Sequence, residues 1–474
     1  MIRAQELNTK AIGGFGRFQD VRVHASREFK LVLLLTLVHI PLGLLLYNAG
    51  SLAILHPAAA FFVGLKWAFK KQVALGQVAL AAGYIVGSEV LWRMAQIPVF
   101  WEFGKYGSIA VMTVALVRRS GFQIPKLPLI YFIALIPGCI LTFIEFDLGG
   151  ARSILSSNLS GPLLLVVSCL FFSNTKLSLP MLSRLCFAVL IPLISVACVT
   201  LFYTVTIEDI SFTGESNLST SGGFGPNQVS SMLGLGAYIS LICLVLFKNT
   251  TKIKVYFALA ALLCTTQSVM TFSRGGMYNA AGAILLVALW EFRNPAEAWK
   301  RFAPVLISLI VFIAFIFPIL NNFTGGSLQE RFEDTGTSAR SEIVESDLAI
   351  FLENPLFGVG VGGAYDRREE YLDRKAMTHT EFSRLLSEHG MFGMVAFLSL
   401  IAMAVYNVKR QRSNLGRAFV IGAAAWCVLF MINAGMRLAA PSFIWGLTFV
   451  TIISSVQSRR LGRSPVVVER HRNV

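Results

Sequence analysis

The sequence predicts an all-α polytopic membrane protein with about 12–14 transmembrane helices and one large periplasmic loop containing short helices. Hydrophobic residues make up 55% of the 474-residue chain and charged residues only 14%. Soluble domains carry about 25% charged residues, so this composition excludes a water-soluble enzyme. The apolar residues are also gathered into runs, and a run of about 20 residues is what one helix needs to cross a bilayer.

The predicted spans follow one another along almost the whole chain. The expected order is a cytoplasmic tail (1–30), helices 1–11 (31–320), a large periplasmic loop (321–390), helices 12–14 (391–457) and a basic cytoplasmic tail (458–474). The first 30 residues lack the apolar core and cleavage site of a signal peptide, so the first span is expected to be retained. The individual spans are predicted at residues 31–48, 52–69, 73–92, 104–117, 128–145, 162–174, 180–204, 228–247, 254–270, 277–291, 302–320, 391–408, 417–435 and 441–457.

The basic residues predict the orientation of these spans. The chain has 41 Lys and Arg against 26 Asp and Glu, a net charge of +15, and most of the basic residues fall into alternate loops on the side of the two termini. This is the positive-inside pattern, which predicts cytoplasmic termini in a bacterial inner membrane and no role for nucleic acid. The segment 321–390 differs, with 13 acidic and 7 basic residues, and is expected to fold outside the membrane.

Several classes of chemistry have no support in the sequence. The seven cysteines form no CxxC pair and no zinc-binding spacing, and no GxxxxGK[ST] loop is present, so neither a metal nor a cofactor is predicted. Gly358–Gly363 matches GxGxxG, but Pro355 and a predicted helix precede it, which favours a tight turn built on positive-φ glycines over a dinucleotide site. Few ionisable residues fall inside the predicted spans, chiefly Glu89, His39 and His56, which disfavours a proton-coupled transporter.

The stretch from Thr378 to Gly390 is the most informative part of the loop. Thr378 and Glu381 have the spacing of a capping box, which predicts a short helix from about His379. The positive end of a helix dipole disfavours imidazolium and attracts phosphate, so His379 would be neutral and able to accept a proton. The alternative is a surface histidine beside a helix cap.

Two arginines on the same predicted side suit an anionic substrate. Arg274 lies alone at the outer end of a span, and Arg340 opens a predicted amphipathic helix that ends near Asn354. A guanidinium binds phosphate oxygens in bidentate fashion. The alternative for either arginine is an interfacial position or an ion pair with a loop carboxylate.

Together these segments resemble the family of O-antigen ligases and related polysaccharide polymerases. His379-Thr380, nine further residues, Gly390, two more and Gly393 is similar to the ligase signature of histidine, a small polar residue, nine residues and G-x-x-G. Asn354–Gly360 is similar to the family's P-x-x-G-x-G turn after an arginine-led helix. Thr271–Gly276 resembles its S-R-G element, and Pro226-Asn227 its P-N element. The likeness spans about residues 220–440.

The resemblance implies a GT-C-like membrane glycosyltransferase that needs no metal. It would transfer a glycan from an undecaprenyl-pyrophosphate-linked oligosaccharide to the hydroxyl of a glycan or lipid acceptor at the periplasmic face, alongside possible chain-length partners. His379 would assist deprotonation of the acceptor, and Arg274 and Arg340 would hold the pyrophosphate. The resemblance implies substrate binding by Asn227, Arg437, Glu381, Gly358 and Gly360.

The kind of transfer stays open at this point. Thr380 stands where ligases more often have Asn, Ser or Gln, which slightly favours a polymerase over a ligase. Two hypotheses from other classes remain: a transporter or flippase for a glycolipid or small anion, and an inactive structural partner in a polysaccharide assembly complex.

Overall fold

The predicted class of all-α polytopic membrane protein is confirmed. The computed structural model describes residues 29–119, 121–207, 210–212, 215–247, 250–334 and 340–453, so the predicted tails lie almost wholly outside the described residues. Within those ranges, ten helices are long and apolar enough to cross a membrane. They are Phe29–Asn48, Gly50–Ala68, Leu75–Met94, Lys126–Glu145, Leu179–Thr206, Pro226–Leu246, Thr251–Met270, Pro295–Phe323, Glu381–Arg410 and Asn414–Ala434.

The number of full-length spans is lower than the predicted 12–14 because several apolar helices are short. An eleventh span arises only if α6 (Leu148–Asn158) and α7 (Ser160–Ser173), which meet at 47°, are counted as one. Helix α4 (Phe103–Val117) has 15 residues and α11 (Gly275–Glu291) has 17. At about 1.5 Å per residue such helices reach only about 22–26 Å. Composition detects the apolar runs, whereas turns at their ends set the helix lengths.

The prediction of one helix over 441–457 is wrong. Helix α20 (Ala439–Leu447) has only nine residues, and strand β2 (Thr451–Ile453) follows it and pairs in parallel with β1 (Lys176–Ser178). The Gln411 side-chain amide donates to the Val450 carbonyl at 2.8 Å, which supports the backbone where the helix has ended. The β-branched residues of β2 suit a strand as well as an apolar span, so composition alone does not separate the two.

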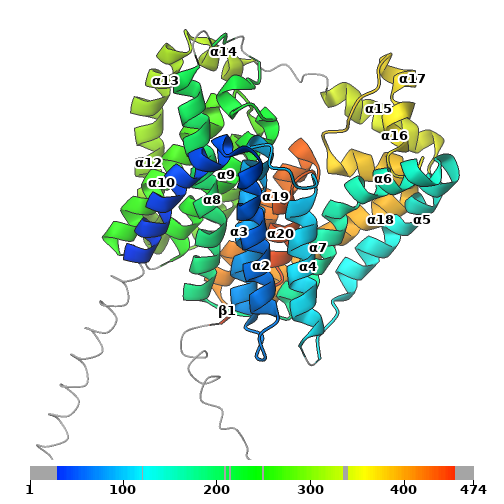
Figure 1. Ribbon diagram of the computed structural model, residues 1–474, viewed down its shortest axis with the longest axis horizontal. Coiled ribbons are helices and arrows are strands. Elements are labelled where there is room, and N and C mark those ends of the chain that lie inside the picture. Colours follow the sequence, from blue (N-terminus) through cyan, green and yellow to red (C-terminus); the bar gives the residue numbers. More distant parts are fainter. Residues whose placement is uncertain are drawn as a thin grey trace, which may run out of the picture. The chain divides into compact units, whose positions relative to one another are not determined.

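The chain divides into two compact units, and helices α2 (Leu55–Ala68), α3 (Leu75–Met94) and α8 (Leu179–Thr206) contribute to both. In the first unit α9 packs against both α10 and α11, and Figure 1 shows α9 beside α10. Close approach depends on Gly276, where a Cβ would lie 1.9 Å from the Ser230 carbonyl oxygen. The elements of this unit besides the shared helices are the helix Phe29–Asn48, η1 (Gly50–Ile54), η2 (Ser219–Ser221), α9 (Pro226–Leu246), α10 (Thr251–Met270), α11, α12 (Pro295–Val311), the π-helical stretch η3 (Phe312–Ile316), α13 (Phe317–Phe323) and α14 (Ser327–Glu333).

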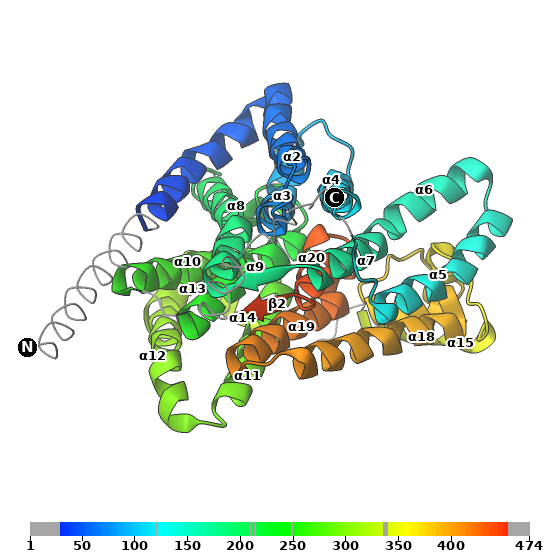
Figure 2. The ribbon, with the colours of Figure 1, turned by 90° about the horizontal axis from the view of Figure 1, so that it is seen from below.

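The second unit is organised around α18, which consists of two helical segments joined at Gly390, where the backbone is non-helical (φ +59°, ψ −135°). Helix α5 lies alongside α18 (Figure 2), and α15 packs against α18 as well. The contact with α5 is close at Gly138, where a Cβ would lie 2.3 Å from the His389 ring. The remaining elements of this unit are α4, α5 (Lys126–Glu145), α6, α7, β1, α15 (Arg340–Glu353), α16 (Gly363–Arg367), α17 (Glu369–Leu372), α18 (Glu381–Arg410), α19 (Asn414–Ala434), α20 and β2.

Helix α18 starts two residues later than predicted. Its N-cap is Thr380, whose hydroxyl oxygen accepts from the Ser383 N–H at 3.1 Å, so the predicted capping box of Thr378 and Glu381 is wrong. The Thr378 hydroxyl instead donates to the Thr380 carbonyl at 3.1 Å. His379 therefore precedes the cap and is not part of the first helical turn.

Candidate active site

His379 lies in a short loop segment, and two arginines hydrogen-bond to the backbone just before it. Arg368 donates to the Ala376 carbonyl at 2.8 Å, and Arg437 donates to the Thr378 carbonyl at 2.5 Å. On the other side of His379, Thr380 caps α18. Hydrogen bonds on both sides of His379 therefore constrain the backbone at this residue.

The surroundings of His379 keep its imidazole neutral. Burial, followed by the positive charges of Arg437, Arg340 and Arg368, lowers the pKa of His379 from 6.5 to about 4. Neutrality was predicted from the helix dipole, but burial and the arginines account for it. A neutral imidazole can accept a proton, and the three positive charges favour an anion in the same place.

These arginines come from three separate elements. Arg340 is the first residue of α15 and donates to the Asn433 side chain at 3.3 Å, and Arg368 follows α16. Arg437 lies in the turn between α19 and α20, where burial and the charge of Arg384 lower its pKa. A strongly positive site is thus assembled from residues almost 100 positions apart in the sequence.

A buried ion pair supports this loop. Arg368 binds Asp347 through Nε at 2.9 Å and through Nη2 at 2.6 Å, and both side chains are almost completely buried. The Ser383 hydroxyl donates to the second carboxylate oxygen of Asp347 at 2.6 Å and also contacts the Thr380 hydroxyl at 2.6 Å. Sequence reasoning missed this pair; the only signal was an aspartate among the apolar residues of the Arg340-led helix.

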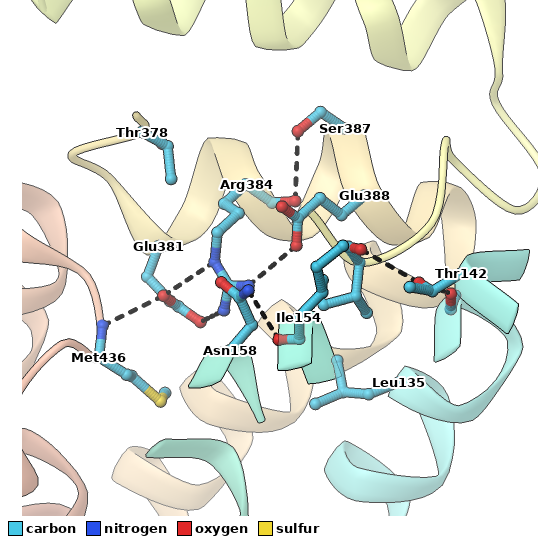
Figure 3. Close-up of polar contacts among 12 residues, drawn as sticks. Leu135, Thr142, Ile154, Asn158, Thr378, Glu381, Arg384, Ser387, Glu388 and Met436 are labelled. Carbon is cyan, nitrogen blue, oxygen red and sulfur yellow. Dashed lines mark hydrogen bonds and ion pairs between the residues drawn. The ribbon is translucent and has the colours of Figure 1, made fainter. Parts of the chain in front are cut away.

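The first turns of α18 carry a second buried network (Figure 3). Arg384 donates to Glu381 at 2.5 Å and to Glu388 at 2.9 Å, and Glu381 also accepts from the Met436 N–H at 3.2 Å. Glu381 thereby holds the turn that carries Arg437. These ionisable groups all precede Gly390, where the backbone leaves the helical conformation (φ +59°, ψ −135°), so they lie before the apolar run 391–408 that was predicted as the span.

Gly358 and Gly360 form the tight turn that was predicted for the GxGxxG segment. Their φ angles are +70° and +79°, and a Cβ on Gly358 would lie 2.5 Å from the backbone of Glu388 and His389. The Val359 and Gly360 N–H groups donate to backbone carbonyls of α18 at 3.0 and 3.1 Å. Helix α15 precedes the turn and α16 follows it, so it does not have the strand-turn-helix context of a dinucleotide site.

In the first unit, the structure brings the P-N and S-R-G elements together. The Ser273 hydroxyl donates to the Asn227 side chain at 2.7 Å, and the Ser230 hydroxyl donates to the Ser273 carbonyl at 2.8 Å. Arg274 occupies the N-cap of α11 and donates to the Asp334 carbonyl. Asn227 and Arg274 are thus close to the same backbone turn at Ser273.

The same unit contains a further buried arginine, Arg93, that the sequence motifs did not indicate. Arg93 is buried at the end of α3, bound to Glu89 at 2.7 Å, and donates to Gln228 at 3.3 Å. Its guanidinium lies 4.7 Å from the centre of the Trp101 ring. The spacing of Glu89 and Arg93, four residues apart, was the available signal for this helical ion pair.

The predicted site residues therefore form two groups, each within one unit. His379, Arg340 and Arg437 share the second unit, where Glu381 and the glycine turn support them. Asn227 and Arg274 share the first unit. Among the described residues, no cluster of three or more His, Cys, Asp or Glu side chains could hold a metal ion.

The helices define a multi-pass membrane protein, and the candidate site is a neutral histidine near three arginines. Residues 259–398 match the family model described as O-antigen ligase. This region, from within α10 to the middle of α18, is similar to that family, in agreement with the resemblance seen in the motifs. It includes Arg274, Arg340 and His379 but not Asn227 or Arg437. No curated protein matches the chain significantly.

The family match supports membrane glycan transfer of the O-antigen ligase or polymerase type, and hence a glycosyltransferase-like enzyme that acts on lipid-linked glycan and an acceptor.

Proposed function

We propose that the chain is a polyprenyl-diphosphate glycan transferase in which His379 is the base for the acceptor hydroxyl. The observation that carries the proposal is a half-buried, neutral imidazole held between Arg340, Arg368 and Arg437. An undecaprenyl pyrophosphate donor supplies the anion that such a site attracts, and the transfer runs without a metal ion. The site is expected at the periplasmic face of the bacterial inner membrane.

The chemical step needs only groups of the substrates and of this chain. The acceptor oxygen attacks the anomeric carbon of the donor sugar, and the bond from that carbon to the pyrophosphate oxygen breaks. The electron pair leaves with the lipid pyrophosphate, and the hydroxyl proton passes to an imidazole nitrogen of His379. Arginines stabilise the charge that grows on the leaving group.

Binding of the donor would also make His379 a better base. The pKa of His379 is lowered partly by the charges of Arg437, Arg340 and Arg368. A bound pyrophosphate offsets those charges, so the pKa rises when the donor is in place. The proton affinity of His379 would therefore increase only when the donor is bound, which is when the acceptor hydroxyl must be deprotonated.

Arg274 and Asn227 are proposed to bind the phosphates of the same class of donor. The support is the family match around Arg274 together with the hydrogen bond between Ser273 and Asn227. Glu381 is proposed to act indirectly, because its carboxylate is buried and bonded to Arg384 and the Met436 N–H. Gly358 and Gly360 are proposed to shape the site by packing on α18.

The test is transfer by purified protein in proteoliposomes supplied with lipid-linked oligosaccharide. His379→Ala is expected to reduce the rate about 10²–10⁴-fold, the usual contribution of a general base. Arg340→Ala is expected to raise the KM for the donor, while Arg367→Ala removes a charge from an exposed ion pair and serves as the matched control. Unchanged rates in the His379 and Arg340 variants would rule out the proposed mechanism.

The transfer assay, together with gel electrophoresis of the surface glycan made by cells that carry each variant, separates the related functions. A polymerase variant would leave single repeats attached to the acceptor, whereas a ligase variant would accumulate lipid-linked polymer beside a bare acceptor. A flippase would move the lipid-linked saccharide across the vesicle membrane without forming a glycosidic bond. We favour polymerase slightly, because Thr380 departs from the residues usual in ligases.

A further inference from the structure

An apolar surface lies at the C-terminal end of α15, in the segment that the sequence places outside the membrane. The exposed side of this helix begins with Glu342 and Glu345 and continues with Leu348 and Leu352. The following turn adds Leu356 and Phe357. Leu352 is 75% exposed, Leu356 59% and Phe357 48%, so most of this face is exposed within the described structure. We call Leu348, Leu352, Leu356 and Phe357 the α15 apolar face.

The α15 apolar face is joined directly to the apolar part of α18. The Phe357 and Phe392 rings stack at 5.6 Å, and the Met391 N–H donates to the Pro355 carbonyl at 2.8 Å. Gly390 lies so close to the turn that a Cβ there would be 2.7 Å from the Leu356 carbonyl group. The two surfaces are therefore held in fixed register by backbone contacts.

Helix α18 changes character at that same point. Before Gly390 it carries Glu381, Arg384, Glu388 and His389, all buried within the unit. After Gly390 its exposed residues are all apolar up to Tyr406, at helical spacing: Met391, Met394, Val395, Leu398, Ile401 and Val405. Such a stripe on a membrane span faces lipid, and charged residues are excluded from it. The bilayer boundary on α18 therefore lies close to Gly390.

We propose that the α15 apolar face is a membrane-contacting surface whose occupant is the acyl-chain region of the bilayer nearest Gly390. Continuity with the lipid-facing stripe of α18 is the argument for lipid as the occupant. Glu353 is exposed about 100° around the helix from Leu352, and its carboxylate accepts from the Tyr371 hydroxyl. Helix α15 is acidic near its N-terminal end and apolar near its C-terminal end. Such a helix can approach the membrane–water interface with its C-terminal end.

The consequence concerns the position of the candidate active site. Arg340 and the α15 apolar face occupy opposite ends of the same helix, about 18 Å apart at the rise of an α-helix. The helix would thus anchor the arginine site to the membrane surface through its own far end. This inference goes beyond the proposed function and does not depend on any transfer reaction.

The test is photolabelling of the full chain in nanodiscs that contain a phosphatidylcholine with a diazirine on its acyl chain. After irradiation, mass spectrometry of peptides is expected to find adducts in residues 348–357 and in 391–405. The segment 366–375, whose residues are mostly polar and exposed apart from the buried Arg368, provides the internal control in which no adducts are expected. Adducts in residues 391–405 without any in 348–357 would overturn the proposal. The α15 apolar face would then contact water, a second copy of the chain or another protein instead of lipid.

Substitutions make the result specific. The double variant Leu352→Glu, Leu356→Glu is expected to lower adduct yield in 348–357 at least about fivefold, because carboxylates are excluded from the acyl region. The double variant Leu352→Ala, Leu356→Ala is expected to stay within about twofold, since it remains apolar. The adduct yield in residues 391–405, which neither variant changes, reports whether the fold is intact. Equal yields from the two variants in 348–357, with labelling of 391–405 retained, would contradict contact with lipid.

Discussion

At the scale of single residues, the charge around His379 predicts the pH dependence of activity. The pKa of His379 is lowered to about 4, first by burial and then by Arg437, Arg340 and Arg368. A base loses activity as the pH falls through its pKa, so kcat/KM of the wild type is expected to stay level down to about pH 5. In Arg437→Gln one repulsive charge is gone, so the pKa of His379 rises and the acid limb moves to higher pH.

The pH profile is measured as kcat/KM for the donor in proteoliposomes, since this parameter reports the free enzyme. The position of the limb is independent of any loss in overall rate. Arg367→Gln is the control, because Arg367 is exposed and paired with Glu370. An acid limb at the same pH in wild type and Arg437→Gln would show that His379 does not set it.

The buried pair of Asp347 and Arg368 predicts a particular pattern of stability. Asp347→Ala leaves the Arg368 guanidinium buried without its carboxylate, and loss of one partner of such a pair costs about 3–5 kcal/mol. Asp347→Ala combined with Arg368→Met removes both charges, so the double variant is expected to be more stable than Asp347→Ala alone. Thermal unfolding in detergent measures this. A double variant as unstable as the sum of the single variants would contradict coupling of the pair.

At the scale of elements, the turn at Gly358 predicts a difference between two glycines with similar backbone. Gly358→Ala and Gly325→Ala both place a side chain at positive φ, +70° and +62°, which costs about 1–2 kcal/mol. Only Gly358 also has the α18 backbone 2.5 Å from the added Cβ, whereas Gly325 has nothing within 4 Å. Gly358→Ala is therefore expected to lower the unfolding temperature clearly more than Gly325→Ala. Equal losses would mean that the turn can move away from α18.

How far the sequence predicts an element depends on whether its signal is local. The helix Arg340–Glu353 and the positive-φ glycine turn follow from neighbouring residues, and both are confirmed. The start of α18 was misplaced because Thr378 and Thr380 are both good capping residues. The choice between them depends on Asp347, more than 30 positions away, which receives hydrogen bonds from Thr378 and Ser383.

The candidate site was predictable in its parts and not in its assembly. Arg340 and His379 stood out as residue types suited to phosphate and proton transfer. Arg368 did not, because its role comes from contact with Asp347 and the Ala376 carbonyl. The lowered pKa of His379 likewise arises from burial and from charges on separate elements, which periodicity and spacing do not reveal.

At the scale of the whole molecule, the number of crossings decides on which side of the membrane α15 lies. Eight of the ten full-length spans precede Arg340, which alone would leave α15 on the same side as the N-terminal segment. The charge pattern predicts the opposite side. An odd number of further crossings before Arg340 is therefore required, and α4, the α6–α7 pair and α11 are the available segments.

Contacts at both ends of these segments show that several run in the same direction. Lys105 near the start of α4 donates to Ser160 at the start of α7, and Arg119 just after α4 donates to Asn174 at the end of α7. The stretch around α20 is parallel to α7 too. Its Ser442 donates to Gly161, and its Thr451 N–H donates to the Thr175 carbonyl. If α7 crosses the membrane, α4 and residues 436–453 therefore cross with it.

The contacts of α11 in the first unit indicate in the same way that it runs in the same direction as α9. Helices α9 and α11 start at one level, where Ser230 contacts the Ser273 carbonyl, and they pack together from there. If all three short segments cross, residues 340–380 are expected to lie opposite the N-terminal side. Helix α20 is only nine residues long, but flanking extended residues add about 3.3 Å each, so 436–453 can still span about 30 Å while buried against α7.

Reporter fusions test this path through the membrane. Alkaline phosphatase, which is active only outside the cytoplasm, is expected to be active after Asp373 and inactive after Lys71, Gly121 and Ile453. The comparison of Lys71 with Gly121 isolates α4, because only α3 and α4 lie between them. Activity after Gly121 would show that α4 does not cross. Alkaline phosphatase activity after both Asp373 and Ile453 would show that residues 436–453 turn back within the membrane. Helix α7 and residues 436–453 would then end on different sides of the membrane. That result would be inconsistent with the hydrogen bond from the Thr451 N–H to the Thr175 carbonyl.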